Sequence, residues 1–348
     1  MRLTRFLLRR TAQGVLVVWG VVTVVFLLRF VTPGSAIDFV APLDASEELR
    51  QRLAADLGLD QPIYVQYVDY IVGLLQLDMG NSLLRGRPAS DVIFARLPAT
   101  LELAVAATIV AIIFSIPIGV ISATRRHDPV DYVATSFSLV GISTPNFWLG
   151  IMLILVFAVQ FSIPYPTISA SLPVPVGIDW FSFPTSRRII GFGEAVGMLV
   201  TEQSLSGLQT WLAHIALPAI TLGTYFTALI TRLTRNGMLE ELGKSYVEVT
   251  RAKGLPETLV RYKHVLRNTM IPIITVLGLQ MGTLIGGAVI TESVFTWPGL
   301  GTLIIDAINS RDWPLIQGSL IIIGTGFVLI NIVVDGLYMY LNPQVEYE

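Results

Sequence analysis

The chain has 348 residues, of which 53% are hydrophobic and only 14% are charged, and its net charge is −2. A soluble domain usually carries about 25% charged residues, so this composition indicates an integral membrane protein. The chain contains no cysteine, which excludes disulfide bonds, thiolate metal sites and thiol nucleophiles.

Six apolar segments are close to the roughly 20 residues that a helix needs to cross a bilayer. Backbone groups in lipid must be paired within the segment, and no alternating strand pattern is present, so we expect an all-α protein with six transmembrane helices. The first apolar run is too long for a cleavable signal and lacks a small-residue cleavage pattern, so it should remain as an anchor. The six expected spans are residues 11–31, 101–123, 134–161, 211–231, 269–291 and 316–341.

The basic residues indicate how these spans are oriented. Fourteen of the 23 fall on one side of the six-span arrangement, and the positive-inside rule places that side, with both termini, in the cytoplasm. The fourteen are Arg2, Arg5, Arg9, Arg10, Arg125, Arg126, Arg232, Arg235, Lys244, Arg251, Lys253, Arg261, Lys263 and Arg267.

The expected organisation leaves large stretches on the outer side. Such surface is suited to docking a delivery protein, although a packed cap without a partner is the alternative. The expected parts are 1–31 with the first span, an extracytoplasmic helical region 32–100, a core 101–341 with an outer insert 162–210 and a cytoplasmic loop 232–268, and a cytoplasmic tail 342–348.

Residues 245–268 form a compact polar island between two apolar runs. The residues from 238 to 253 favour a helix, and Gly254 followed by Pro256 supplies a stop signal. Apolar and charged side chains alternate along this helix, which suits insertion into a groove on a soluble partner. A solvated basic loop that only satisfies the positive-inside rule is the alternative.

The island resembles the Glu-Ala-Ala loop of ABC importer membrane subunits, with Glu248, Val249, Thr250 and Gly254 at the matching positions. Both alanines of that pattern are replaced here. The run RAKGL at 251–255, the HxLRN motif at 264–268 and a later proline instead resemble the dipeptide, oligopeptide and nickel branch of these permeases.

The resemblance extends over nearly the whole chain. Residues 168–207 are the exception, since this stretch is longer than the usual outer loop of that branch. The similar segments are LGLDQPIYVQYVDYIVGLLQLDMGNS at 57–82, LPATLEL at 97–103, GISTPNFWLG at 141–150, HIALPAITLG at 214–223, TESVFTWPGLG at 291–301 and the spacing from Asn331 to Asp335.

The resemblance implies a type I ABC importer permease fold in the inner or plasma membrane, and a non-catalytic subunit that forms half of a pathway for peptides, nickel, a sugar or a related solute. It implies a second, related permease, two ATPases that hold ATP and Mg, and an extracytoplasmic binding protein; no cofactor is expected on this chain. It also implies that the following residues couple to an ATPase: Tyr246, Val247, Glu248, Val249, Thr250, Arg251, Ala252, Lys253, Gly254 and Leu255.

Within the spans, Gly278, Gly282 and Gly286 recur every four residues and so lie on one helix face. Close helix packing is one interpretation of this ridge, and lining of the pathway is the other. Polar residues in lipid tend to face a bundle interior, and Asp335 with the residue one turn earlier suggests a tether between helices. The polar candidates are Asn146, Gln280, Asn331 and Asp335, with Glu102 and Glu292 nearer the outer interface, where solvation alone would account for their charge.

Other function classes find little support. Gly243-Lys244-Ser245 ends like a phosphate-binding loop, but the required earlier glycine is displaced by one position to Gly237. The histidines do not share a site, so no catalytic residue and no metal site is expected, and the basic residues are explained by topology rather than by nucleic acid. A self-contained secondary transporter or channel remains the alternative, although the inverted repeats typical of such carriers are not found.

Overall fold

The computed structural model describes residues 2–31, 46–56, 58, 60–157, 184 and 187–341. Its ordered elements there are helices, apart from one isolated bridge between Asn81 and Pro88. Five helices are long and apolar enough to cross a membrane, and a bent helix pair brings the number to six. These helices are α1 (Arg2–Val31), α5 (Ala89–Thr124), the pair α6 (Pro129–Ser143) and α7 (Asn146–Phe157), α9 (Ser206–Leu242), α12 (Leu266–Gly287) and α15 (Trp313–Leu341).

Shorter helices occupy the connections at the two ends of the bundle. One of them, α8, lies within the expected outer insert 162–210. They are α3 (Glu47–Asp56), α4 (Ile63–Leu75), α8 (Phe192–Thr201), α10 (Ser245–Ala252), α11 (Glu257–Leu259), the π-helix η1 (Val260–Val265), α13 (Val289–Val294) and α14 (Leu300–Asn309). The expected tail 342–348 and much of the outer stretches lie outside the described residues.

The third expected span is not one straight helix. The chain bends by 109° between α6 and α7. Pro145 accounts for this break, because a proline disfavours helical backbone at the residue before it, and Thr144 is extended with ψ 124°. Pro117, Pro218 and Pro272, by contrast, lie inside α5, α9 and α12.

Small residues allow the central helices to pack closely. α5 and α9 have the most extensive contact in the described part of the chain. A Cβ atom added to Gly223 of α9 would lie 2.9 Å from the carbonyl oxygen of Ala107 on α5, so only glycine permits this approach. The core that α5, α9 and α12 share contains Ala99, Ala104, Ala107, Ala111, Leu222, Ile230 and Ile273.

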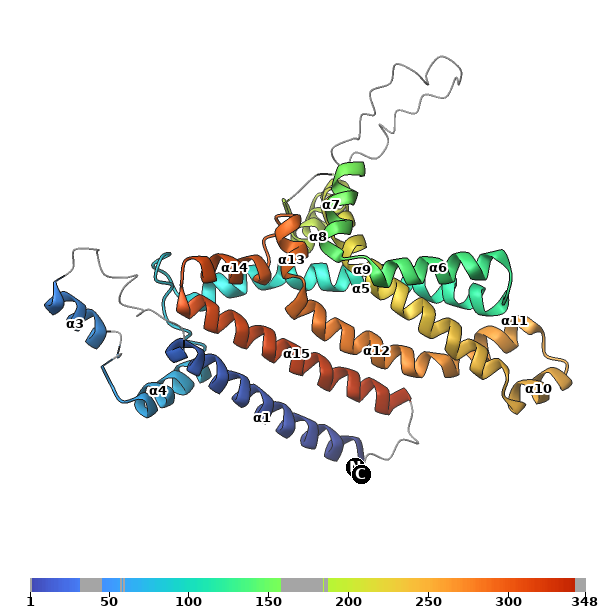
Figure 1. Cartoon of the computed structure of the whole chain (residues 1–348), viewed down its shortest axis with the longest axis horizontal. Helices are drawn as coiled ribbons and strands as arrows, with labels where there is room; N and C mark the ends of the chain where they lie inside the picture. Colours follow the sequence, from blue (N-terminus) through green and yellow to red (C-terminus); the bar gives the residue numbers. More distant parts are fainter. Residues whose placement is uncertain are drawn as a thin grey trace, which may run out of the picture.

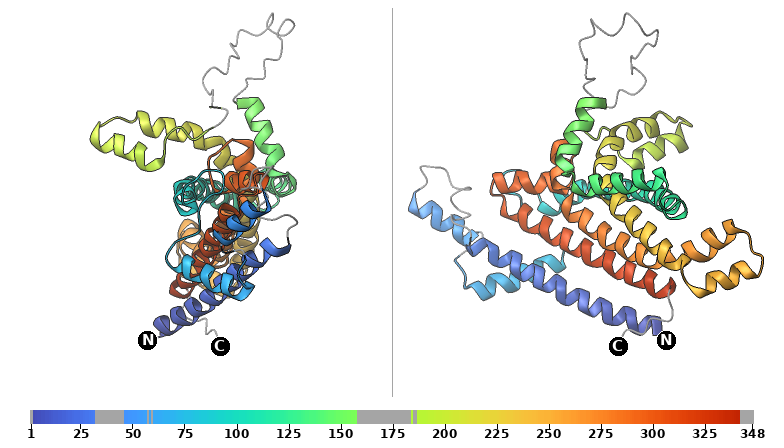
Figure 2. Two further views of the ribbon diagram at one scale, coloured as in Figure 1. Left: turned by 90° about the vertical axis from the view of Figure 1, so that its left-hand side faces the viewer. Right: turned by 45° about the vertical axis from the view of Figure 1, so that its right-hand side comes forward.

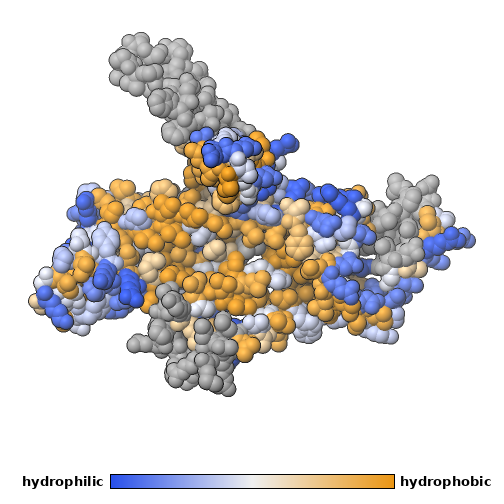
Figure 3. Space-filling model, turned by 180° about the vertical axis from the view of Figure 1, so that it is seen from behind, coloured by the Kyte–Doolittle hydropathy of each residue, from blue (hydrophilic) through white to orange (hydrophobic). Residues whose placement is uncertain are grey.

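The helices run side by side, with α15 lying between α1 and α12 (Figure 1). The beginning of α1 and the end of α15 lie at the same end of the bundle as α10 and α11 (Figures 1 and 2). The space-filling view shows a broad apolar band across the middle, with hydrophilic residues gathered toward the two ends (Figure 3). This distribution is what a bilayer-spanning bundle requires.

Candidate functional site

The polar island folds as a short helix at one end of the bundle. α10 spans Ser245–Ala252, and the chain leaves it through Gly254, whose φ of +76° suits glycine. The expectation of one continuous helix over 238–253 was wrong, since α9 ends at Leu242 and Lys244 is extended with ψ 147°. The break lets α10 leave the direction of α9 and run separately below it (Figure 1).

One face of α10 anchors it to the bundle. Val247 is fully buried against Met238 of α9 and against Val260 and Val265 of η1. Tyr246 and Leu255 are half-buried and pack against the same cluster. Two apolar members of the predicted coupling set, Tyr246 and Leu255, therefore pack against the bundle.

The opposite face of α10 is open. Val249 is the exposed apolar residue, with 54% of its surface accessible. Thr250 is half-buried and donates a hydrogen bond to the carbonyl oxygen of Tyr246. The exposed members of the predicted coupling set are Glu248, Val249, Arg251, Ala252, Lys253 and Gly254.

A carboxylate at the end of α9 ties three segments together. The Tyr246 hydroxyl of α10 donates to Glu241 Oε2 at 2.7 Å, and the Lys244 ammonium group contacts the other carboxylate oxygen. Asn268, in the first turn of α12, donates from Nδ2 to the Tyr246 oxygen at 3.2 Å. Burial, together with the hydrogen bond to Glu241, raises the pKa of Tyr246, so the phenol keeps its proton and acts as the donor.

A second charged group closes the turn after α10. Glu257 accepts from Arg251 Nε at 2.6 Å and from Arg261 Nε at 3.1 Å. The hydrogen bond to Glu257 raises the pKa of Arg251. All three side chains are well exposed, so these ion pairs shape the turn more than they stabilise the fold.

The glycine ridge of α12 faces α15. A Cβ atom at Gly278 would lie 2.1 Å from Val334, and one at Gly282 would lie 2.8 Å from Phe327. At Gly286 the nearest atom, on Ile323, is 3.5 Å away. This geometry supports the packing interpretation for Gly278 and Gly282, because a side chain at either position would separate the two helices.

The polar candidates within the spans lie apart from one another. Asp335 of α15 forms an ion pair with Arg10 of α1, with Nε and Oδ2 3.2 Å apart, which supports a tether between helices. Asn331 is half-buried one turn earlier, and Asn146 is half-buried at the break between α6 and α7. Gln280 accepts a hydrogen bond from Thr283 of its own helix at 3.1 Å.

A buried ion pair that the sequence analysis missed joins α6 to α9. Asp131 accepts from Arg235 at 2.6 and 2.8 Å, and Ser122 of α5 donates to Asp131 Oδ1 at 2.5 Å. Asp131 is 3% exposed. The sequence does show Asp131 as an acidic residue in the first turn of a helix that follows Asp128-Pro129. It does not show that the partner of Asp131 is Arg235, which lies 104 residues away.

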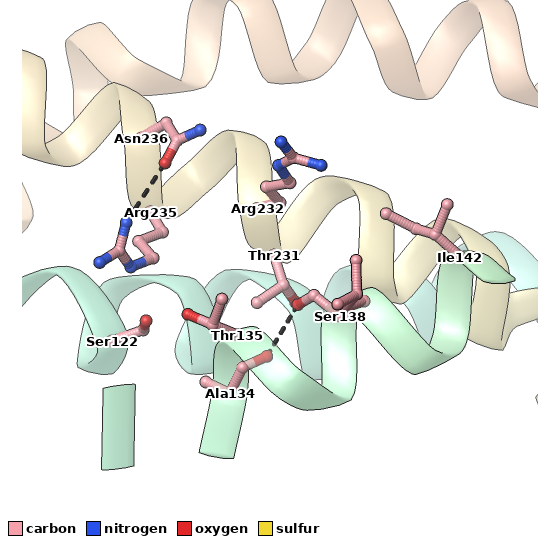
Figure 4. Close-up of a pocket in the computed structure, with 10 residues that line it drawn as sticks. Ser122, Ala134, Thr135, Ser138, Ile142, Thr231, Arg232, Arg235 and Asn236 are labelled. Atoms are coloured by element: carbon pink, nitrogen blue, oxygen red, sulfur yellow. Dashed lines mark hydrogen bonds between the residues drawn. The ribbon is translucent and has the colours of Figure 1, made fainter. Parts of the chain in front are cut away.

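A cavity of about 320 Å³ lies beside this ion pair. Figure 4 shows its lining, with side chains of α6 on one side and those of α9 on the other. The residues drawn include the hydroxyls of Thr135 and Ser138 and the guanidinium of Arg235, so the lining combines polar and apolar groups.

The expectation that Glu292 is solvated near the outer interface was wrong. Glu292 is 0% exposed and accepts hydrogen bonds from the Thr100 hydroxyl at 2.7 Å and from the Thr302 amide at 3.0 Å. A Cβ atom at Gly299 would lie 2.2 Å from its carboxylate, so the glycine makes room for it. Burial raises the pKa of Glu292.

Glu102 is also paired rather than merely solvated. Its carboxylate accepts from Arg188 at 2.8 and 2.9 Å, from the Phe192 amide at 3.0 Å and from Trp211 at 3.3 Å. The hydrogen bonds that Arg188 donates to Glu102 raise the pKa of Arg188. Glu102 thereby fixes the segment that leads into α8 against α5 and α9.

Comparison with known proteins agrees with this architecture. Residues 115–347 match the family described as binding-protein-dependent transport system inner membrane component, and residues 3–104 match the N-terminal part of such membrane components. The dipeptide transport system permease protein DppB of Escherichia coli K12 is 37% identical over 345 residues, covering 99% of each chain.

Two further relatives are named for the transport of other solutes. The oligopeptide transport system permease protein AppB of Bacillus subtilis 168 is 36% identical, and the alignment covers 98% of this chain and 99% of AppB. The glutathione transport system permease protein GsiC of Salmonella choleraesuis is 35% identical and covers 94% of each chain.

Among solved structures, the inward-facing MetNI methionine ABC transporter has a TM-score of 0.49 at 16% identity, covering 70% of this chain and 93% of that one. The family match spans most of the described helices, and the relatives span nearly the full length. The chain therefore belongs to the family of binding-protein-dependent transport system inner membrane components, and it is a multi-pass membrane protein.

Proposed function

We propose that this chain is the permease subunit of an ATP-driven importer and forms half of a translocation pathway for peptides. The relatives named for dipeptide, oligopeptide and glutathione transport support a peptide solute. In this proposal a second, related permease completes the pathway, two ATPases bind ATP and Mg, and an extracytoplasmic protein delivers the solute.

The proposal that α10 couples this chain to an ATPase rests on one observation. α10 is fixed to the bundle by the fully buried Val247, while Val249 and Ala252 on its other face stay exposed at the end of the bundle. A short helix held in this way can fit a groove on a soluble chain and transmit its movement. We infer that the exposed face docks an ATPase.

The orientation follows from the basic residues. The start of α1, the end of α15 and α10 lie at the same end of the bundle, and the positive-inside rule assigns this end to the cytoplasm. Both termini are therefore placed in the cytoplasm, and α3, α4, α8 and α14 are placed toward the outer side.

The test is reconstitution of the full complex in liposomes, with dialanine as the probe. Val249→Asp places a charge on the exposed face without disturbing the buried anchor, and we expect it to abolish ATP-driven uptake while the chain still inserts. Val249→Thr is the control, because it keeps the size of the exposed side chain and adds no charge, so uptake should be close to that of the wild type.

Two results would contradict the proposal. ATPases that still bind and drive full uptake after Val249→Asp and Ala252→Asp together would exclude α10 as the docking element. Uptake of dialanine by this chain alone, without any ATPase, would favour the self-contained carrier instead.

A further inference from the structure

The end of α9, the start of α10 and the start of α12 meet at a single polar group, the carboxylate of Glu241. We propose that Glu241, Tyr246 and Asn268 form a polar clamp that makes α10, the end of α9 and the start of α12 move as one body. This inference rests on the proposed function, because it states how movement of α10 reaches the spanning helices.

Tyr246 is the positioning residue of the clamp. Its ring packs among the apolar residues beneath α10, and its hydroxyl both donates to Glu241 at 2.7 Å and accepts from Asn268 at 3.2 Å. The ring therefore sets the depth of α10, and the hydroxyl sets its position relative to the two long helices. A phenylalanine at this position would keep the first role and lose the second.

The three contacts differ in strength. The Glu241 side chain is only 13% exposed, and hydrogen bonds to charged groups are stronger than neutral ones. Asn268 is exposed, and its contact with Glu241 Oε2 is long at 3.5 Å. The link from α10 to α9 should therefore be stronger than the link from α10 to α12.

Apolar contacts alone do not fix the position of α10 along α9 and α12. Apart from Met238 and the ring of Tyr246, the cluster beneath α10 consists of aliphatic side chains, and apolar contacts have no preferred direction. The η1 π-helix that precedes α12 is a wide, less regular turn of a kind often found at functional sites. Directional hydrogen bonds across the junction supply the register that the aliphatic residues do not fix.

The test compares how much dialanine the reconstituted complex takes up for each ATP it hydrolyses. Loss of folded complex lowers uptake and hydrolysis together and leaves this ratio unchanged, so the ratio separates transmission from folding. Tyr246→Phe should lower the ratio several-fold, because it removes the hydroxyl that joins α10 to Glu241 and to Asn268. Asn268→Ala should lower it less.

The two changes should not add. Since Tyr246 and Asn268 share the same hydrogen bond, the double variant should be close to Tyr246→Phe alone. Tyr262→Phe is the matched control: it removes the same hydroxyl from an exposed residue of η1, and the ratio should not change. Glu241→Gln should also lower the ratio, because a neutral amide is a weaker acceptor for the Tyr246 hydroxyl, and Glu240→Gln is its control, because the Glu240 side chain is 78% exposed.

A ratio that stays at the wild-type value in Tyr246→Phe, while Val249→Asp abolishes uptake, would overturn the clamp and leave the docking proposal standing. Full addition of the two single effects would also overturn it. If the wild-type complex hydrolyses ATP but moves no dialanine, the proposed peptide function fails, and the clamp as a transmission element fails with it.

Discussion

Asp131 of α6 and Arg235 of α9 form a two-point ion pair, with nitrogen to oxygen distances of 2.6 and 2.8 Å. Ser122 and the backbone amide of His127 complete the hydrogen bonding of the carboxylate. The pair joins three helices at the end of the bundle nearest α10, next to the cavity shown in Figure 4.

Asp131→Asn should destabilise the chain. Removing one partner of a buried pair costs about 3–5 kcal/mol, and the 22% exposure of the Arg235 side chain lowers our expectation to about 2 kcal/mol. The loss is measured by titrating the purified chain with sodium dodecyl sulfate. Asp128→Asn is the control, because Asp128 is exposed and its side chain caps nothing. Equal stability of the two variants would show that the ion pair between Asp131 and Arg235 does not stabilise the fold.

Gly278→Ala should separate α12 from α15. The added Cβ would lie 2.1 Å from Val334, and overpacking of this kind costs about 1–3 kcal/mol. Gly286→Ala makes the same chemical change where the nearest atom is 3.5 Å away, so it should be tolerated. Thermal unfolding of the two variants in detergent tests the difference. If Gly278→Ala unfolds at the same temperature as Gly286→Ala or at a higher one, α12 and α15 do not pack closely at Gly278.

Glu292→Ala should loosen the connection between α13 and α14. It leaves the buried Thr100 hydroxyl and the Thr302 amide without their acceptor, at a cost of about 3 kcal/mol. Glu292→Gln keeps an oxygen at this place and should cost about 1 kcal/mol. Proteolysis of the purified variants at residues 295–299 reports the loosening. Resistance of Glu292→Ala equal to that of the wild-type chain would show that the carboxylate holds nothing in place.

The apolar spans and the family could be predicted from the sequence because both depend on local patterns. Hydrophobic length located the spans, and the residues from Glu248 to Gly254 carried the resemblance. The break of the third span could not be placed, since Pro117, Pro218 and Pro272 lie inside continuous helices and Pro145 does not. Because the same local rule applies to all four prolines, the sequence alone did not single out Pro145.

Hydrogen bonds between residues far apart in the sequence could not be predicted either. Glu292 bonds Thr100 across 192 positions, and nothing near either residue indicates the other. The inward orientation of Tyr246 was missed for a similar reason, because its acceptor Glu241 lies beyond a helix break that the sequence did not predict. Helical propensity continued across Gly243 and Lys244, whereas the folded chain turns there.

The chain has no cysteine, so a single one can be introduced at Ala252 on the exposed face of α10. The decisive measurement is labelling of Ala252→Cys by a membrane-impermeant maleimide in intact cells and in inverted membrane vesicles, with and without the ATPase subunits. The account predicts labelling only in inverted vesicles, and protection when the ATPases are present. Labelling in intact cells, or labelling that the ATPases do not slow, would contradict it.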